Sequence, residues 1–214
     1  MEPPSTSMPR LVVRPAVPSE FSLVLPVCVE AFADEAVSAW VEPEPELRQD
    51  RTRELFETSL RAAVDAGQLL VAFLPGGYPV AASVWADLDS TPPTAEPPAR
   101  FEHDRPATRR LAAVLAATSA RHPYAPHVYL SAMAALPHRR GLGAGTAMLR
   151  YGLTRSRELG LPVYLEASTP RNRRLYARHG FHDLGEPIHL PEGGPVLQPM
   201  WHADDGPTAA EAPA

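Results

Sequence analysis

Several residue types are scarce or missing in this sequence of 214 residues. There is no lysine, and cysteine, isoleucine and asparagine each occur once, as Cys28, Ile188 and Asn172. The missing lysine excludes Schiff-base chemistry and the phosphate-binding loop of P-loop proteins, which requires a lysine. A single cysteine excludes a disulfide framework and a cysteine-rich zinc site, and it makes the cytoplasm the default location.

Negative charge slightly exceeds positive charge, and long hydrophobic runs are missing. The chain has 20 basic residues, all arginine, and 25 acidic residues, so the net charge is −5. This balance argues against a nucleic-acid backbone as the main partner. No stretch reaches the roughly 18 apolar residues of a membrane span, and residues 1–10 lack the apolar core of a signal peptide. None of the eight histidines pairs at i, i+4 spacing on a predicted helix, so we expect no metal site.

Proline, in contrast, is abundant, and its distribution outlines the domain. The 26 prolines are about 12% of the chain against an average near 5%, but the windows 46–74 and 138–161 contain none. Prolines therefore lie mainly between the predicted helices and strands. A length of 214 residues is typical of one domain. We predict a single domain over residues 11–202, between disordered tails at residues 1–10 and 203–214.

Hydrophobic periodicity and turn residues indicate an α/β protein. Two predicted helices precede a β-hairpin, a proline-rich segment at 88–99 follows it, and strands alternate with helices in the second half. The expected strands cover residues 11–14, 69–74, 79–86, 127–136, 162–167, 181–188 and 195–202. The expected helices cover residues 19–33, 46–66, 106–120, 144–159 and 171–179.

The most informative motif is a glycine-rich turn between a predicted strand and a predicted helix, Arg140-Gly141-Leu142-Gly143-Ala144-Gly145. Free N–H groups and the positive end of the helix dipole make such a turn a site for phosphate. A dinucleotide fingerprint requires a third glycine or alanine, but the matching positions hold Thr146 and Met148, so we reject it. The alternative to a phosphate site is that the glycines only make a tight turn.

This motif, with the preceding strand that ends in Ala135-Leu136-Pro137, resembles the acyl-coenzyme A signature of the GNAT superfamily of N-acetyltransferases. The order of the expected elements is similar to that of the family over nearly the whole chain. The resemblance implies a mixed central sheet of about seven strands, flanked by helices, with a splay between its two central strands. Acetyl-CoA would lie in that splay and serve as co-substrate, without a metal.

The resemblance also implies which residues bind the cofactor. The backbone of Met133, Ala134 and Ala135 would pair with the pantetheine arm, and Asn172 would face the cofactor from a short helix. The pyrophosphate would be held by Arg140, Gly141, Leu142, Gly143, Ala144, Gly145 and Thr146.

The C-terminal part of the chain extends the resemblance to one subgroup. Residues 164–172, YLEASTPRN, and residues 189–195, HLPEGGP, are similar to the subgroup that contains puromycin N-acetyltransferase. Residues 31–34 in the first helix are similar as well. This likeness implies an aminonucleoside or a related antibiotic as the acceptor.

Acetyl transfer to an amine needs a base for the ammonium group and an acid for the departing thiolate. Tyr176 matches the position of the family's general acid, and a structural tyrosine beside Phe181 is the alternative. Glu166 is the candidate base, because a desolvated pocket at the splay would raise its pKa. The alternative for Glu166 is an ion pair with Arg150 or Arg174.

Two residues of the second hairpin strand are candidates for acceptor binding. Asp87 would attract a cationic amine or act through water, and Trp85 would line an aromatic pocket. A solvated acid and a core tryptophan are the alternatives. The sequence thus predicts a cytoplasmic enzyme, monomer or homodimer, that acetylates a small-molecule amine. The other possibility is a protein of the same fold that binds acyl-CoA as a sensor or assembly module without turnover.

Overall fold

The computed structural model of the protein describes residues 11–89 and 105–203. These ranges include most of the expected domain. Apart from residue 203, the predicted tails lie outside the described residues, as does most of the predicted segment 88–99. No helix in the described ranges is long and apolar enough to span a membrane.

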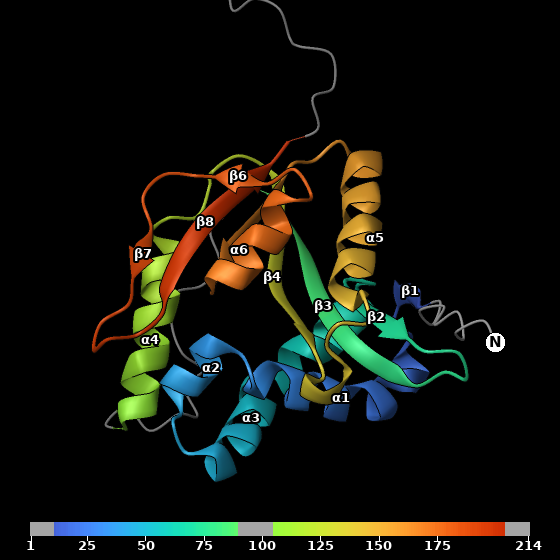
Figure 1. The fold of residues 1–214 in the computed structure, drawn as a ribbon, viewed down its shortest axis with the longest axis horizontal. Helices are drawn as coiled ribbons and strands as arrows, with labels where there is room; N and C mark the ends of the chain where they lie inside the picture. The colour runs from blue at the N-terminus through green and yellow to red at the C-terminus, as the bar shows by residue number, and fades with distance from the viewer. Residues whose placement is uncertain (1–10, 90–104, 204–214) are drawn as a thin grey trace, which may run out of the picture.

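Strands and helices follow one another in nearly the expected order (Figure 1). The strands are β1 (Val12–Pro15), β2 (Leu69–Phe73), β3 (Pro79–Leu88), β4 (His127–Ala135), β5 (Val163–Ala167), β6 (His182–Asp183), β7 (Ile188–His189) and β8 (Val196–His202). The helices are α1 (Phe21–Ala33), α2 (Ala36–Val41), α3 (Pro45–Asp65), α4 (Pro106–Ser119), α5 (Ala144–Leu159) and α6 (Pro170–Ala177), and short 3-10 turns cover Pro18–Glu20 and Pro137–Arg139.

Two elements differ from the expectation. The short helix α2 was not predicted, since its six residues carry too little periodicity to mark a helix. The predicted strand 181–188 is wrong, because Gly185 with a φ angle of 68° turns the chain and leaves only the short strands β6 and β7. The other predicted boundaries agree to within two residues.

The strands form one mixed sheet in the order β1-β2-β3-β4-β5-β8-β6, with β7 paired to β8. The central pair β4 and β5 is parallel, and it is held only at Val128 with Val163 and at Tyr129 with Tyr164. Beyond Tyr129, β4 pairs with β3 and no longer with β5, so the sheet opens along the second half of β4. The predicted α/β fold with an opening between central strands is confirmed.

Helices cover both faces of the β1–β4 half of the sheet. Alternate strand residues point to opposite faces, so Val71 and Ala82 join the core beneath α1 and α3, while Ala72 and Ala81 join the core beneath α5. Helix α6 contacts β5 beside the opening, and α2 packs against α4 (Figure 1). The opening is therefore bordered by α6 and by the end of α1.

Gly152 allows α5 to lie close to the sheet. A Cβ atom at this position would lie 2.2 Å from the ring of Trp85, which is fully buried. We expect Gly152→Ala to lower the free energy of unfolding by about 1–3 kcal/mol, because a packed core does not absorb an extra methyl group without strain. Thermal denaturation measures the effect, with Glu158→Ala on the exposed side of the same helix as control. Equal midpoints for the two variants would contradict this packing.

Candidate active site

A cavity of about 480 Å³ lies where the glycine-rich loop joins β4 to α5. Gly141 and Gly143 have φ angles of 86° and 80°, a conformation that side chains disfavour, and Gly143 is the N-cap of α5. Because Gly143 to Thr146 line the cavity, the first turn of α5 lies at its edge with N–H groups that have no partner within the helix. This end of α5 also carries the positive pole of the helix dipole.

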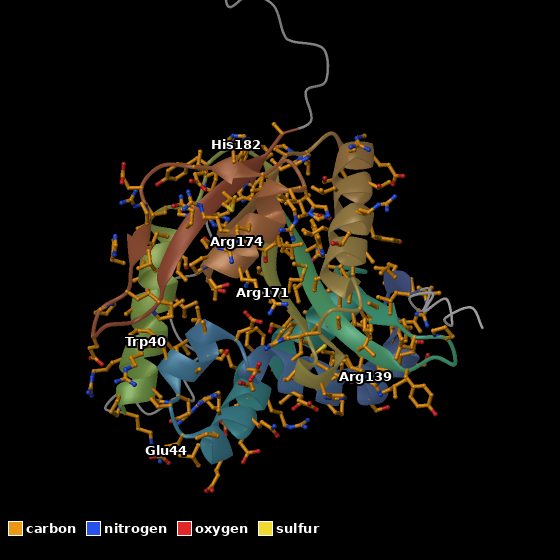
Figure 2. All side chains as sticks on the ribbon, in the orientation of Figure 1. Trp40, Glu44, Arg139, Arg171, Arg174 and His182 are labelled. Atoms are coloured by element: carbon orange, nitrogen blue, oxygen red, sulfur yellow. The ribbon has the colours of Figure 1, made fainter. Side chains whose placement is uncertain are left out.

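Arginine side chains add positive charge to the same cavity. Arg139 beside the loop and Arg171 in the first turn of α6, both labelled in Figure 2, line the cavity, and so does Arg140. Arg140 donates a hydrogen bond of 2.5 Å to the carboxylate of Asp34, just after α1, and so ties the loop to that helix. The combination of free backbone N–H groups and guanidinium groups suits a pyrophosphate.

The structure brings nearly all of the predicted cofactor-binding residues to this cavity. The exception is Leu142, which does not line it. The predicted residues that do are Met133, Ala134, Ala135, Arg140, Gly141, Gly143, Ala144, Gly145, Thr146 and Asn172.

A second cavity, of about 460 Å³, adjoins the first. Glu35, Met133 and Asn172 line both cavities, so a ligand in one can meet a ligand in the other at these residues. The walls come from α1 to α4, from α6 and from β4, β5 and β8, and most of the exposed wall surface is apolar although polar side chains are numerous. The apolar lining includes Phe32, Val41, Leu55, Phe56, Leu111, Val114, Leu115 and Leu197.

Glu166 projects from β5 into the second cavity. One carboxylate oxygen, Oε2, accepts a hydrogen bond of 2.9 Å from the hydroxyl of Tyr129, while Oε1 is buried without a partner among the described residues. Burial raises the pKa of Glu166 to about 7, although the hydrogen bond from Tyr129 opposes the shift. The hydrogen-bond partner of this carboxylate is thus a tyrosine and not Arg150 or Arg174, and the group can gain or lose a proton near neutral pH.

Two buried histidines, His122 and His127, pack near Tyr129 and Tyr164. The Nε2 atoms of His122 and His127 lie 3.0 Å apart, and Nδ1 of His127 lies 2.6 Å from the carbonyl oxygen of Ala125. The ring of His122 packs edge-on against both Tyr129 and Tyr164. Burial, followed by the charge of the neighbouring His127, lowers the pKa of His122 to about 4, so His122 is neutral at pH 7. Burial also lowers the pKa of His127. No group of three or more side chains suited to a metal occurs among the described residues.

Tyr176 lies in α6, whose first turn is capped by Thr169, since the Oγ1 atom accepts a hydrogen bond from the N–H of Asn172. The Tyr176 side chain is 5% exposed, packs beside Phe181 and also lines the second cavity. Burial, and then the negative charge of Glu35, raise the pKa of Tyr176 above its ordinary value. The phenol therefore keeps its proton at neutral pH, next to the cavity that holds Glu166.

The two residues predicted to bind the acceptor lie elsewhere. Trp85 is buried in the core against α5, and its indole N–H donates to the hydroxyl of Ser83 at 2.9 Å. Asp87 forms an ion pair of 2.6 Å with Arg155 of α5. Neither lines either cavity, so both expectations are corrected: alternation along β3 directs these side chains toward α5.

The sheet opens between two central strands, beside a loop suited to pyrophosphate and a cavity with a buried carboxylate and a phenol, and this arrangement suits an enzyme that binds a nucleotide cofactor. The model of the Acetyltransferase (GNAT) family matches residues 29–181. The chain belongs to this family and is an acetyl-CoA-dependent N-acetyltransferase.

Solved structures support the same fold. A Corynebacterium glutamicum protein named histone acetyltransferase HPA2 and related acetyltransferase is 29% identical, with a TM-score of 0.68 over 94% of this chain and 99% of its own. The polyamine N-acetyltransferase of Drosophila melanogaster, which forms N-acetylagmatine, is 20% identical, with a TM-score of 0.63 over 91% of this chain and 100% of its own. The PaiA N-acetyltransferase of Thermoplasma acidophilum, solved with coenzyme A, is 11% identical, with a TM-score of 0.58 over 91% of this chain and 99% of its own.

Proposed function

We propose that this protein transfers the acetyl group of acetyl-CoA to the primary amine of a small molecule, with Glu166 as general base and Tyr176 as general acid. The observation that carries the proposal is the meeting of two cavities. One has a phosphate-binding loop, and the other contains the unpartnered oxygen of Glu166 together with Tyr176. A structure that only bound acyl-CoA would not need a buried carboxylate with a pKa of about 7 beside the junction.

The cofactor fits the first cavity through groups that this chain supplies. The loop from Arg140 to Thr146 would hold the pyrophosphate, and the open half of β4 from Met133 to Ala135 would offer backbone groups to the pantetheine arm. Asn172, shared by both cavities, would lie near the reacting end. Acetyl-CoA supplies an acetyl group activated as a thioester.

The residues of the second cavity would perform the proton transfers. Glu166 would take a proton from the acceptor's ammonium group, so that the free amine can attack the thioester carbonyl carbon. The bond from that carbon to sulfur then breaks, and Tyr176 would give its proton to the thiolate. The nitrogen loses its second proton to solvent as the amide forms, and solvent returns a proton to the phenolate of Tyr176. Both groups hold the required form at neutral pH, since Glu166 titrates near 7 and the pKa of Tyr176 is raised.

The acceptor class is tested with a panel of amines. The likeness of residues 164–172 and 189–195 to the puromycin-type subgroup places puromycin in the panel. Agmatine, polyamines and arylalkylamines join it, because structural neighbours are named for these amines. Release of free coenzyme A thiol with at least one amine is expected. Tight binding of acetyl-CoA with no release for any amine of the panel would contradict the proposed acceptor class.

The loop glycines provide a test of the cofactor site. Replacing Gly143, with its φ angle of 80°, by alanine introduces backbone strain of about 1–2 kcal/mol in the loop. We expect Gly143→Ala to weaken coenzyme A binding about tenfold, measured by calorimetry. The matched control is Gly67→Ala, which also has a positive φ angle, 67°, but lies outside the cavity. Equal affinities for the two variants would contradict this placement of the pyrophosphate.

A further inference from the structure

The carboxylate of Glu35 lies at the junction of the two cavities and has no part in the proton transfers proposed above. We propose that Glu35 is a specificity-determining residue that binds the acceptor's ammonium group, so that the site selects strongly basic alkylamines over weakly basic aromatic amines. This inference rests on the proposed function, because it concerns the acceptor of that same site.

The backbone around Glu35 fixes its place between α1 and α2. Its N–H donates to the carbonyl oxygen of Phe32 at 3.1 Å, and its carbonyl oxygen accepts from Ala39 at 2.9 Å. Asn172 of α6 is the other polar residue that lines both cavities, and it interacts with the Glu35 side chain from across the opening. Glu35 therefore lies at the point where an amine from the second cavity must arrive.

The cation nearest to Glu35 is engaged elsewhere, so the charge of this carboxylate can be neutralised by an acceptor ammonium group. Burial raises the pKa of Glu35, and the charge of Arg140 opposes that shift. Arg140, however, is bonded to Asp34 and belongs to the loop suited to pyrophosphate. Glu35 is half-buried, and a carboxylate partly removed from water is stabilised by a positive group, which an acceptor ammonium would supply.

Glu42 also lines the second cavity, but it does not line the first and so lies away from the junction. The two arginines of the second cavity have partners other than Glu35. Arg48 donates to the backbone carbonyl groups of Glu42 and Pro43 at 2.7 Å, and Arg51 lies 3.7 Å from the carboxylate of Glu54. Most of the exposed wall surface is apolar and suits the carbon skeleton of an amine. Glu166 would remove the proton from the ammonium group, and Glu35 would hold that group before the transfer.

Benzylamine and aniline test the effect of the acceptor's charge, because the two amines are similar in size. Both are primary amines with one phenyl ring, but at pH 7 benzylamine is an ammonium ion and aniline is neutral. For Glu35→Gln we expect the KM of benzylamine to rise at least tenfold while kcat changes less than threefold, so that the preference for benzylamine over aniline falls. Glu35→Asp should recover part of the loss. The control Glu46→Gln removes an exposed carboxylate on α3 that lines neither cavity, and it should leave the preference between the two amines unchanged.

Calorimetric binding of benzylamine to the coenzyme A complex separates this inference from the proposed function. Tighter binding by the wild type than by Glu35→Gln supports the inference even if no amine is acetylated. Three results would overturn it: equal binding by both proteins, no binding by the wild type, or a hundredfold loss of kcat in Glu35→Gln at unchanged KM. The last result would make Glu35 part of the proton transfer instead.

Discussion

Replacing Glu166 by glutamine should lower kcat by about 10²–10⁴-fold, the range that a positioned acid or base contributes. Glutamine keeps the size of the side chain and can still accept the hydrogen bond from Tyr129, but it cannot take a proton. In the wild type, kcat/KM should rise with pH through about 7, because the pKa of Glu166 is raised to that value and only the ionised carboxylate acts as a base. Steady-state kinetics between pH 5.5 and 8.5, roughly one and a half units to each side of that pKa, would show this rise in the wild type and not in the variant.

Unfolding measurements show whether the loss of activity comes from a loss of structure. The pKa of Glu166 is about 7 in the folded protein against 4.5 for a free glutamate, so between these values the folded state binds more protons than the unfolded chain. Stability from this group is therefore present at low pH and is lost as the pH rises through 7. Glutamine carries no such charge, so Glu166→Gln at pH 8 should unfold at a temperature no lower than the wild type does. A less stable variant, or one with full activity, would contradict the role assigned to Glu166.

The cofactor loop could be predicted from sequence because its chemistry depends on consecutive residues. A turn that needs positive φ angles at Gly141 and Gly143, directly before a helix, is visible without knowledge of the rest of the fold. The strands and helices around it follow from their periodicity in the same local way. Leu142 is the one loop residue whose side chain turned out to lie away from the cavity.

The residues that bind the acceptor could not be predicted, because periodicity does not identify the face of the sheet on which a cavity lies. Alternation shows that Trp85 and Asp87 share one face of β3, but it does not show which face the acceptor cavity adjoins. In the fold that face lies beneath α5, where Gly152 and Arg155 contact them. The cavity lies on the face bordered by α1 and α3.

The residues that sequence reasoning missed come from segments far apart in the chain. Tyr129, which hydrogen-bonds Glu166, belongs to the strand next to it in the sheet, and His122 precedes that strand. Glu35 follows a predicted helix with no motif around it, and only the junction between α1 and α2 brings it to Asn172. The one available sequence signal for Glu35 was its position directly after residues 31–34, which are similar to the puromycin-type subgroup.

Tyr176→Phe is expected to lower kcat about a hundredfold or more with little change in the affinity for acetyl-CoA. Phenylalanine preserves the ring beside Phe181 and removes only the hydroxyl group, so the packing of α6 should persist. Without that proton the sulfur must leave as a free thiolate from a largely apolar cavity, where a bare charge is poorly stabilised. Turnover and calorimetric binding of acetyl-CoA measure the two effects separately.

Removal of an exposed hydroxyl by Tyr151→Phe on α5 is the matched control and should leave kcat unchanged. Because burial and Glu35 raise the pKa of Tyr176, its phenol should stay protonated up to its ordinary pKa of about 10, so the wild type should show no fall in rate from this group below that pH. A purely structural tyrosine would instead show a lower unfolding midpoint in Tyr176→Phe together with weaker binding of both substrates. Unaltered turnover in a stable Tyr176→Phe variant would remove this residue from the acid role and leave solvent to protonate the thiolate.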